Sequence, residues 1–476
     1  MNAAQSAPPG RPSPPVVNPI LGGQAVESRD RTELTALDGS VLASIGLAPR
    51  LLAQAAVNRL RTAAQQAAQQ QTGGPPPGPE LFATAGELFA NAELDGESPA
   101  EYRRRVVLAT GTPGPAVSRA IENIRRSLGL VERINQAELP LPFAAPGYRT
   151  HWVPRGALLA AIVPNNHPEP NVSWVRALAM GLRVLVRPGS KDPFTPRRLT
   201  LALLAAGLDP DALAFLPGGH EVGEHLLAQA DLGLIYGGPA AVERYAKRSD
   251  VLVRGPGRSK ALVEAGAERD EQLLAALVEW IAEDGGVRCN NTSLVLTSGP
   301  VEPLAEALAA RLAALPVLPV LDEQATLPAT GEADGKALAD HLAALTGGAT
   351  ATDHSSAHHD SPLAHPGDGS TVLRPLVVSV TDGADPLVGT ELGFPFVVVA
   401  PWRAEQGVRP LRDSLVVSLT GEHAGLAERV LREPSVRKVV TGLVRPWAGV
   451  PETPHDGSLS QFLLEPKGLV DAEVTG

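Results

Sequence analysis

The sequence predicts an α/β fold, in which helices cover a parallel sheet, and three observations support this prediction. Short apolar segments alternate with amphipathic ones between Trp152 and Tyr236, as strands alternate with their connecting helices in a parallel sheet. A second block of the same texture follows Cys289. The chain has 476 residues, of which 43% are apolar, so it can bury a large core and form two or three domains.

The N-terminal part is predicted to be mainly helical. Residues 48–71 are rich in good helix formers and end at a Gly- and Pro-rich stretch, residues 72–79, that cannot continue a helix. A second helix-rich region covers residues 86–133. Residues 1–18 are rich in Pro, Ser and Gly and lack the apolar core of a signal peptide, so we expect a flexible lead-in.

The first alternating block predicts four strands and three helices. The strands are expected over residues 156–164, 183–187, 214–217 and 232–236, and the helices over 171–179, 195–206 and 221–230. Because parallel strands end at a common edge, this arrangement is the usual setting for a dinucleotide.

The second block predicts helices over residues 271–282 and 301–314 and strands over 293–297, 371–380 and 396–400. Residues 347–369 are rich in Gly, His, Asp and Ser and predict a surface loop. Four histidines between residues 354 and 365 make metal binding conceivable, but a solvated loop is favoured because no regular element is expected to scaffold a site. No metal site is therefore predicted.

Composition excludes several classes of protein. There are 41 basic and 52 acidic side chains, and the resulting net charge of −11 argues against a nucleic-acid partner. A single cysteine, Cys289, excludes an intramolecular disulfide framework and any multi-cysteine zinc or iron–sulfur site. The longest apolar runs are far shorter than the roughly 18–20 residues of a membrane span, so we expect a cytoplasmic protein.

Cys289 is the first candidate for chemistry. It follows the helix predicted over residues 271–282 and a Gly-Gly turn, so it can lie on a loop that faces a cleft. Its neighbour Arg288 would favour the thiolate, which is the nucleophilic form. A lone cysteine is more often buried and inert, but the polar neighbours Arg288, Asn290 and Asn291 fit that alternative less well.

Three polar turns follow predicted strands at the edge where parallel sheets bind ligands. In the first, the Asn166 amide could donate to a developing oxyanion, although an Asn-rich turn with a helix cap explains the same residues. In the second, Arg187 and Lys191 could hold a phosphate or belong to an ordinary solvated turn. In the third, a pyrophosphate could lie beside Gly238, but such Gly-Gly turns are common.

In this order, the segments resemble the aldehyde dehydrogenase superfamily over residues 18–470. Pro164-Asn-Asn-His-Pro168 is similar to the family's Pro-Trp-Asn-Phe-Pro segment, and Val186-Arg-Pro-Gly-Ser190 to Lys-Pro-Ser/Ala-Glu. Gly286-Val-Arg-Cys289 resembles Gly-Gln-x-Cys, and Glu391-Leu-Gly-Phe-Pro395 resembles Glu-x-Phe-Gly-Pro. The resemblance implies that Cys289 is the nucleophile and Asn166 the oxyanion donor. It assigns cofactor contacts to Pro164, Arg187, Ser190, Lys191, Gly238, Glu391 and Phe394.

The resemblance also implies a domain organisation. A Rossmann-type NAD(P)-binding domain would cover residues 19–260 and include oligomerisation strands near 135–152. An α/β catalytic domain would cover residues 261–440, and residues 441–476 would form a C-terminal return and oligomerisation segment. The small β extension would join subunits into a homodimer or homotetramer.

One departure from the family pattern concerns the reaction. Arg254 aligns with the glutamate that activates water in hydrolytic members, and arginine cannot be a general base at neutral pH. Arg254-Gly-Pro-Gly-Arg258 instead resembles the CoA-acylating, thioester-reducing branch, in which the acyl-enzyme exchanges with a thiol. We therefore expect NADPH-dependent reduction of an acyl thioester, carried by CoA or an acyl carrier protein, to an aldehyde, or the reverse. The alternatives are an aldehyde dehydrogenase that forms a free acid with a relocated base, and a catalytically drifted scaffold.

Two further positions concern the cofactor and the substrate tunnel. Ser190 stands where NAD-preferring members usually carry a ribose-binding glutamate, and Arg187 and Lys191 could pair with a 2′-phosphate, so NADP(H) is favoured over NAD(H). His455 lies where the family places a loop that closes the substrate tunnel. It could act there, but a structural role at a subunit contact is favoured.

Overall fold

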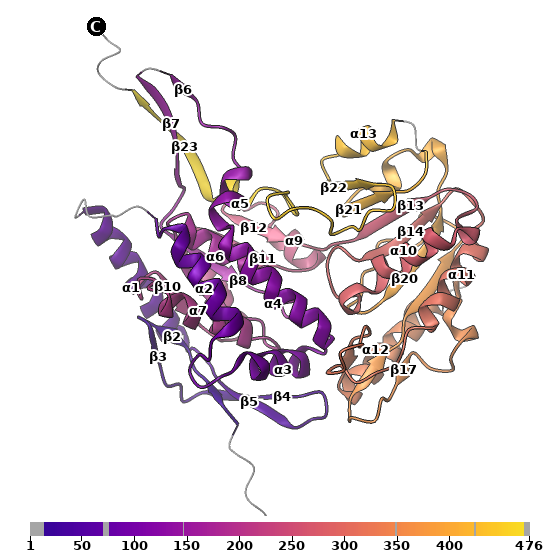
Figure 1. The fold of residues 1–476 in the computed structure, drawn as a ribbon, viewed down its shortest axis with the longest axis horizontal. Helices are drawn as coiled ribbons and strands as arrows, with labels where there is room; N and C mark the ends of the chain where they lie inside the picture. The colour runs from indigo at the N-terminus through magenta and orange to yellow at the C-terminus, as the bar shows by residue number, and fades with distance from the viewer. Residues whose placement is uncertain (1–13, 70–75, 146, 348–349, 423–424, 471–476) are drawn as a thin grey trace, which may run out of the picture.

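The computed structural model describes residues 14–69, 76–145, 147–347, 350–422 and 425–470. Two seven-stranded sheets, each flanked by helices, form two lobes, and a narrow β arm extends from the first lobe (Figure 1). The predicted α/β fold class is confirmed. The N-terminal sequence forms the first lobe, and most of the chain after residue 259 forms the second.

The first sheet has the strand order β12-β11-β8-β9-β10-β2-β3. Its parallel strands are β8 (Leu158–Ile162), β9 (Arg183–Arg187), β10 (Leu213–Phe215), β11 (Leu232–Tyr236) and β12 (Val251–Arg254), with β2 (Ile20–Leu21) and β3 (Gln24–Ala25) antiparallel at one edge. The connecting helices are α6 (Val172–Ala179), α7 (Phe194–Ala205), α8 (His220–Gln229) and α9 (Pro239–Tyr245). The four strands and three helices that the sequence predicts here are thus present, with ends shifted by at most two residues.

Alternate residues of the central strand β8 enter two different cores. Leu158 and Ala160 belong to a core that includes residues of α1 (Arg50–Gln69) and α8. Leu159 and Ala161 belong to a second core, on the other face, that includes residues of α6 and α7. Because successive side chains of a strand point to opposite faces, a central strand covered on both sides reads as a continuous apolar run. This explains why the sequence showed such runs without polar alternation.

The N-terminal helices are α1, α2 (Pro79–Asn91), α3 (Pro99–Thr110), α4 (Gly114–Gly129) and α5 (Val131–Ala137). The flexible lead-in expected over residues 1–18 is wrong for the part that the structure describes. Residues 1–13 lie outside the described residues, but β1 (Val16–Val17) pairs in parallel with β5 (Val41–Gly46), next to β4 (Arg31–Thr35). Val17 is buried, so apolar contact outweighs the Pro-rich surroundings.

The second sheet has the strand order β16-β19-β20-β14-β13-β21-β22. These strands are β13 (Ser259–Val263), β14 (Thr292–Thr297), β16 (Ala351–Asp353), β19 (Leu376–Val380), β20 (Phe396–Pro401), β21 (Ser414–Leu419) and β22 (Val436–Thr441). Helices α10 (Glu271–Ala282) and α11 (Val301–Ala313) cover one face, and α12 (Glu332–Thr346) and α13 (Leu426–Leu431) contribute to the core on the other. The predicted helices and strands of this block are present, apart from one interruption.

That interruption and the His-rich stretch are the main corrections to the predicted fold. The strand expected over residues 371–380 breaks into β18 (Thr371–Leu373) and β19 around Pro375, which cannot donate a backbone hydrogen bond. The predicted loop contains two short strands, β16 and β17 (Leu363–Ala364). β16 belongs to the seven-stranded sheet, whereas β17 forms a three-stranded sheet with β18 and β15 (Ala329–Thr330). His354 is buried, with Nε2 2.9 Å from Ser379 Oγ and 3.1 Å from Glu302 Oε2. Residues 348–349 lie outside the described residues.

The arm consists of β6 (Ala144–Ala145), β7 (Tyr148–Pro154) and β23 (Leu464–Val470), preceded by α14 (Leu459–Leu463). β7 and β23 pair antiparallel along seven residues, and Figure 1 shows them projecting beyond the first lobe. Tyr148, Leu469 and Val470 are exposed apolar side chains on it. No helix among the described ranges combines the length and the apolar character of a membrane span.

Candidate active site

A cavity of about 720 Å³ lies between the two lobes. It is lined by the ends of β11 and β12, the loop after β8, the loop before β14 and residues 447–456 of the C-terminal segment. Five of the nine residues that the resemblance assigns to the site line it: Pro164, Asn166, Gly238, Cys289 and Glu391. Arg254 and His455 line it as well. The tertiary structure therefore brings the proposed nucleophile, oxyanion donor and part of the cofactor contacts to one place.

A tight turn after α10 presents Cys289 to this cavity. The turn runs through Asp284 and Gly285 with φ of 54° and 81°, followed by Gly286 with φ of 66°. At Gly286 a Cβ would lie 2.6 Å from the backbone nitrogen of Pro395, so only glycine fits there. Glycine is also required at Gly257, just before β13, because a Cβ there would lie 1.9 Å from the Cys289 carbonyl oxygen.

The Cys289 thiol is neutral at neutral pH. Burial raises its pKa to about 12, and the carboxylates of Glu391 and Asp456 act in the same direction. Arg288 does favour the thiolate, as expected, but burial outweighs its effect on the thiol pKa. The Arg288 guanidinium lowers the thiol pKa only in part, and it is engaged elsewhere, 2.8 Å from Asp284 Oδ2. A base is therefore needed to form the thiolate.

His455 is placed to be that base, since its Nε2 lies 3.6 Å from Cys289 Sγ. Burial lowers the pKa of His455 to about 4, with Asp456 opposing the shift and Arg254, Lys438 and Arg288 adding to it. The imidazole is thus neutral at pH 7 and able to accept a proton. The sequence favoured a structural role for His455, because nothing local in the chain shows that a residue 166 positions after Cys289 folds against it.

Asn166 connects the two lobes at the cavity. Its Nδ2 donates to the carbonyl oxygen of Val287, 2.8 Å away, two residues before Cys289. A side-chain amide nitrogen carries two hydrogens, so this bond leaves one for a ligand. Asn166 is therefore held beside the Cys289 loop while it retains a donor.

The carboxylate of Glu391 is bound to the chain segment just before β13. Its Oε2 accepts a hydrogen bond from the backbone nitrogen of Gly257 at 2.9 Å, and burial raises its pKa despite the backbone donors of Gly257 and Arg258. Phe394, which the resemblance assigned to the cofactor, does not line the cavity. It is buried against Phe396, with ring centroids 6.3 Å apart, as part of the core of the second lobe.

The groups expected to bind a ribose phosphate lie outside this cavity. Arg187 Nε donates to the carbonyl oxygen of Gly218 at 3.0 Å, and Lys191 Nζ forms an exposed ion pair of 3.4 Å with Asp334. Ser190 is exposed. At Gly238, which opens α9, an added Cβ would meet nothing within 4 Å, so this turn is open to a ligand.

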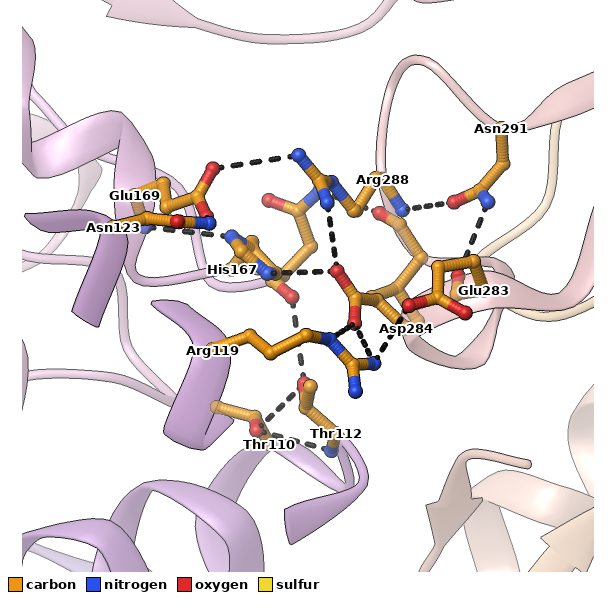
Figure 2. Close-up of polar contacts among 12 residues, drawn as sticks. Thr110, Thr112, Arg119, Asn123, His167, Glu169, Glu283, Asp284, Arg288 and Asn291 are labelled. Carbon is orange, nitrogen blue, oxygen red and sulfur yellow. Dashed lines mark hydrogen bonds and ion pairs between the residues drawn. The ribbon is translucent and has the colours of Figure 1, made fainter. Parts of the chain in front are cut away.

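Next to the Cys289 loop, four ionisable side chains from different parts of the chain contact one another (Figure 2). We name this group the Asp284 cluster: Asp284, Arg119, Arg288 and His167. Asp284 is 1% exposed and accepts hydrogen bonds from both arginines, with Arg119 Nε at 3.1 Å. His167 Nε2 lies 3.7 Å from its Oδ2. Burial alone would raise the pKa of Asp284, but these three partners hold it well below its usual range.

The Asp284 cluster ties together three parts of the chain. Arg119 belongs to α4, His167 to the loop that carries Asn166, and Arg288 to the loop that carries Cys289. Arg288 also reaches Glu169 at 3.4 Å, again in the loop after β8. The cluster therefore links the loop that carries Asn166 to the loop that carries Cys289. In the part of the chain that the structure describes, no three His, Cys, Asp or Glu side chains are grouped as metal ligands.

The model of the aldehyde dehydrogenase family matches residues 109–432. N-succinylglutamate 5-semialdehyde dehydrogenase 2 of Caulobacter vibrioides is 32% identical over 157 residues, 31% of either chain. Malonate-semialdehyde dehydrogenase 3 of Geobacillus kaustophilus is 26% identical over 298 residues, 59% of either chain. This chain thus spans between about a third and three-fifths of such curated relatives.

Solved structures agree over nearly the whole chain. Gamma-glutamyl-gamma-aminobutyraldehyde dehydrogenase from Burkholderia cenocepacia has a TM-score of 0.78 at 19% identity, covering 95% of this chain and 96% of its own. An indole-3-acetaldehyde dehydrogenase in complex with NAD⁺ has a TM-score of 0.75 at 20% identity, covering 96% and 97%. These likenesses show the fold, and together with the family match they lead to one conclusion. The chain belongs to the aldehyde dehydrogenase family.

Proposed function

We propose that this protein oxidises an aldehyde with NAD(P)⁺ through an acyl intermediate on Cys289, with His455 as the proton acceptor. The contact of 3.6 Å between Cys289 Sγ and His455 Nε2 carries this proposal. A thiol with a pKa of about 12 reacts at neutral pH only with a base beside it, and a histidine with a pKa of about 4 is neutral there.

The protein's own residues account for the covalent steps. His455 Nε2 takes the thiol proton as Sγ bonds to the aldehyde carbon, and the Asn166 amide stabilises the oxyanion that forms. After oxidation the acyl group remains as a thioester on Cys289. His455, once it has passed its proton to solvent, accepts a proton from the water that attacks this thioester. The products are the carboxylic acid and the free thiol.

The cofactor supplies one function, the acceptance of a hydride. Glu391 and Gly238 line the cavity and fit its nicotinamide end, since Glu391 offers a carboxylate oxygen to a ribose hydroxyl and the Gly238 turn is open. Arg187, Ser190 and Lys191 would face the other ribose. We propose a preference for NADP(H), because Lys191 can exchange its exposed partner Asp334 for a 2′-phosphate at little cost.

A second candidate is exchange of the acyl group with a thiol of CoA or an acyl carrier protein, which includes thioester reduction in reverse. Arg254 favours it, because the cavity holds a cation where hydrolytic members are expected to hold a carboxylate. Arg254 removes a carboxylate base from this position, but it does not leave the cavity without a base. His455 supplies a base from the C-terminal segment.

One experiment separates the two candidates. The protein is incubated with aldehyde and NADP⁺ or NAD⁺, with and without CoA, and both products are quantified. We expect free acid at the same rate without CoA and faster turnover with NADP⁺. Product formation that requires CoA and yields acyl-CoA would overturn acid formation in favour of thiol exchange. The Cys289→Ala variant is the matched control and is expected to yield neither product.

We also propose that the arm of β6, β7 and β23 joins subunits into a homodimer or homotetramer. Its exposed apolar side chains and the open edges of a small sheet support this proposal. Light scattering on the full chain, compared with a Leu469→Lys, Val470→Lys double variant, tests it. A monomeric wild-type protein would contradict it.

A further inference from the structure

Arg254 is a partly buried cation that forms no ion pair among the described residues. It ends β12 and lines the cavity, and its Nε is buried with no hydrogen-bond partner among the described residues. Nη1 lies 3.5 Å from the Ser173 hydroxyl, and no ion pair in that part of the chain includes Arg254. A buried N–H without an acceptor loses a hydrogen bond, so a ligand oxygen that accepts from Nε would be favoured here.

The nearby carboxylates are already engaged. Glu138 Oε2 lies 2.7 Å from Arg176 Nη2 and accepts the backbone N–H of Ser460 at 2.9 Å. Asp456 lies 3.9 Å from Arg437. Burial would lower the pKa of Arg254, but Tyr236 and these two carboxylates more than offset that effect, so the guanidinium remains charged.

Hydroxyl groups complete the surroundings of this cation. Tyr236 and Ser173 line the same cavity, and their hydroxyl oxygens are hydrogen-bonded to each other at 2.7 Å. Tyr236 is also the register partner of Arg254 on β11. A guanidinium binds a carboxylate by parallel hydrogen bonds. The Tyr236 hydroxyl donates to the carbonyl oxygen of Pro170 at 3.2 Å, so the two hydroxyls hold the guanidinium in place and leave the donation to the ligand to Arg254.

We propose that Arg254, with Tyr236 and Ser173, forms a subsite for an anionic oxygen group, and that this group is the carboxylate of the aldehyde substrate. The substrate class would then be short semialdehydes, which carry a carboxylate at one end and an aldehyde at the other. This inference rests on the proposed function, because the aldehyde end must reach Cys289 in the same cavity. A phosphate of the cofactor shares the chemistry and is distinguished by the test.

The test compares succinate semialdehyde with butanal, which has the same number of carbons and no carboxylate. We expect the wild-type protein to show at least a tenfold higher kcat/KM for the semialdehyde. Arg254→Gln should reduce this preference by about 10- to 100-fold, mainly through KM, and Arg254→Lys should retain part of it. Arg311→Gln, which removes an exposed ion pair with Glu271 remote from the cavity, is the matched control and should retain all of it.

Two binding measurements separate the possible failures. Calorimetric titration of the cofactor-free protein with succinate, and with succinamide as a neutral control, should show binding of succinate that Arg254→Gln abolishes. If Arg254→Gln weakens NADP⁺ binding but leaves the aldehyde preference unchanged, the anion is a cofactor phosphate and the substrate class is wrong.

Equal use of both aldehydes by the wild-type protein would also overturn the inference, even if the variants fail to fold. Oxidation of neither aldehyde would instead contradict the proposed function, and succinate binding would then decide the subsite independently.

Discussion

Two groups of ionisable residues lie near Cys289, and they differ in how far their hydrogen-bonding and charged groups are paired. In the Asp284 cluster a buried carboxylate has two arginines and a histidine around it. In the second group, Arg254 has no ion pair among the described residues, and the neutral imidazole of His455 lies beside the neutral thiol of Cys289. The satisfied cluster stabilises the loop, whereas the unsatisfied groups are available for chemistry.

The largest effect is expected at the nucleophile. Replacing Cys289 by Ser keeps the size and removes the reactive sulfur, so kcat should fall by about 10⁴-fold or more. NADPH formation measures the rate, and mass spectrometry should detect an acyl adduct on the wild-type protein alone. The thermal midpoint of the variant should match that of the wild type. Residual activity within tenfold of the wild type would remove Cys289 from the mechanism.

The next largest effect is expected at His455. His455→Gln should lower kcat by about 10²- to 10⁴-fold, because the thiol loses its proton acceptor. The wild-type rate should decrease as the pH falls toward about 4, where His455 becomes protonated. The variant should lose this dependence and gain activity as the pH rises toward the thiol pKa of about 12. Identical pH–rate profiles would show that His455 is not the base.

Breaking the Asp284 cluster should affect stability more than chemistry. Asp284→Asn leaves Arg288 and Arg119 without their buried anion, and we expect a loss of about 3–5 kcal/mol of unfolding free energy. Because the pKa of Asp284 is lowered on folding, its contribution is present above the pKa of the unfolded chain and is lost as the pH falls below it.

Urea titrations at neutral and acidic pH measure both effects. Asp334→Asn, in the exposed pair with Lys191, is the control and should cost about 0.5 kcal/mol or less. If Asp284→Asn lowers the free energy of unfolding no more than Asp334→Asn does, the Asp284 cluster does not stabilise the fold.

The smallest effect is expected at the rim of the same cluster. Arg119 is 49% exposed, and Arg288 continues to hold Asp284 when it is removed, so Arg119→Gln should cost only about 1 kcal/mol. In the double variant with Asp284→Asn the two costs should not add, since both remove the same contact. Full additivity in urea titrations would show that the two residues act independently.

The elements of the first sheet were predictable to within a few residues, because apolar periodicity and Gly or Pro breaks act locally. The strand at residues 232–236 and the helix at residues 271–282 are present as predicted. The predicted loop over residues 347–369 was wrong where β16 pairs with β19, since a polar segment gives no local sign of a distant partner. Phe394 was assigned to the cofactor by its place in a motif, but it packs into the core of the second lobe, and the order of residues does not reveal that packing.

The sequence by itself determined the α/β fold and the turns that carry Asn166 and Cys289, since both follow from local patterns and from the family's motifs. Only the tertiary structure decided the chemistry around the thiol. It turned Arg288 away toward Asp284, and it brought His455 from 166 residues along the chain to Sγ. The physical reason is that ionisation depends on burial and on the charges within a few ångströms, and neither follows from position in the chain.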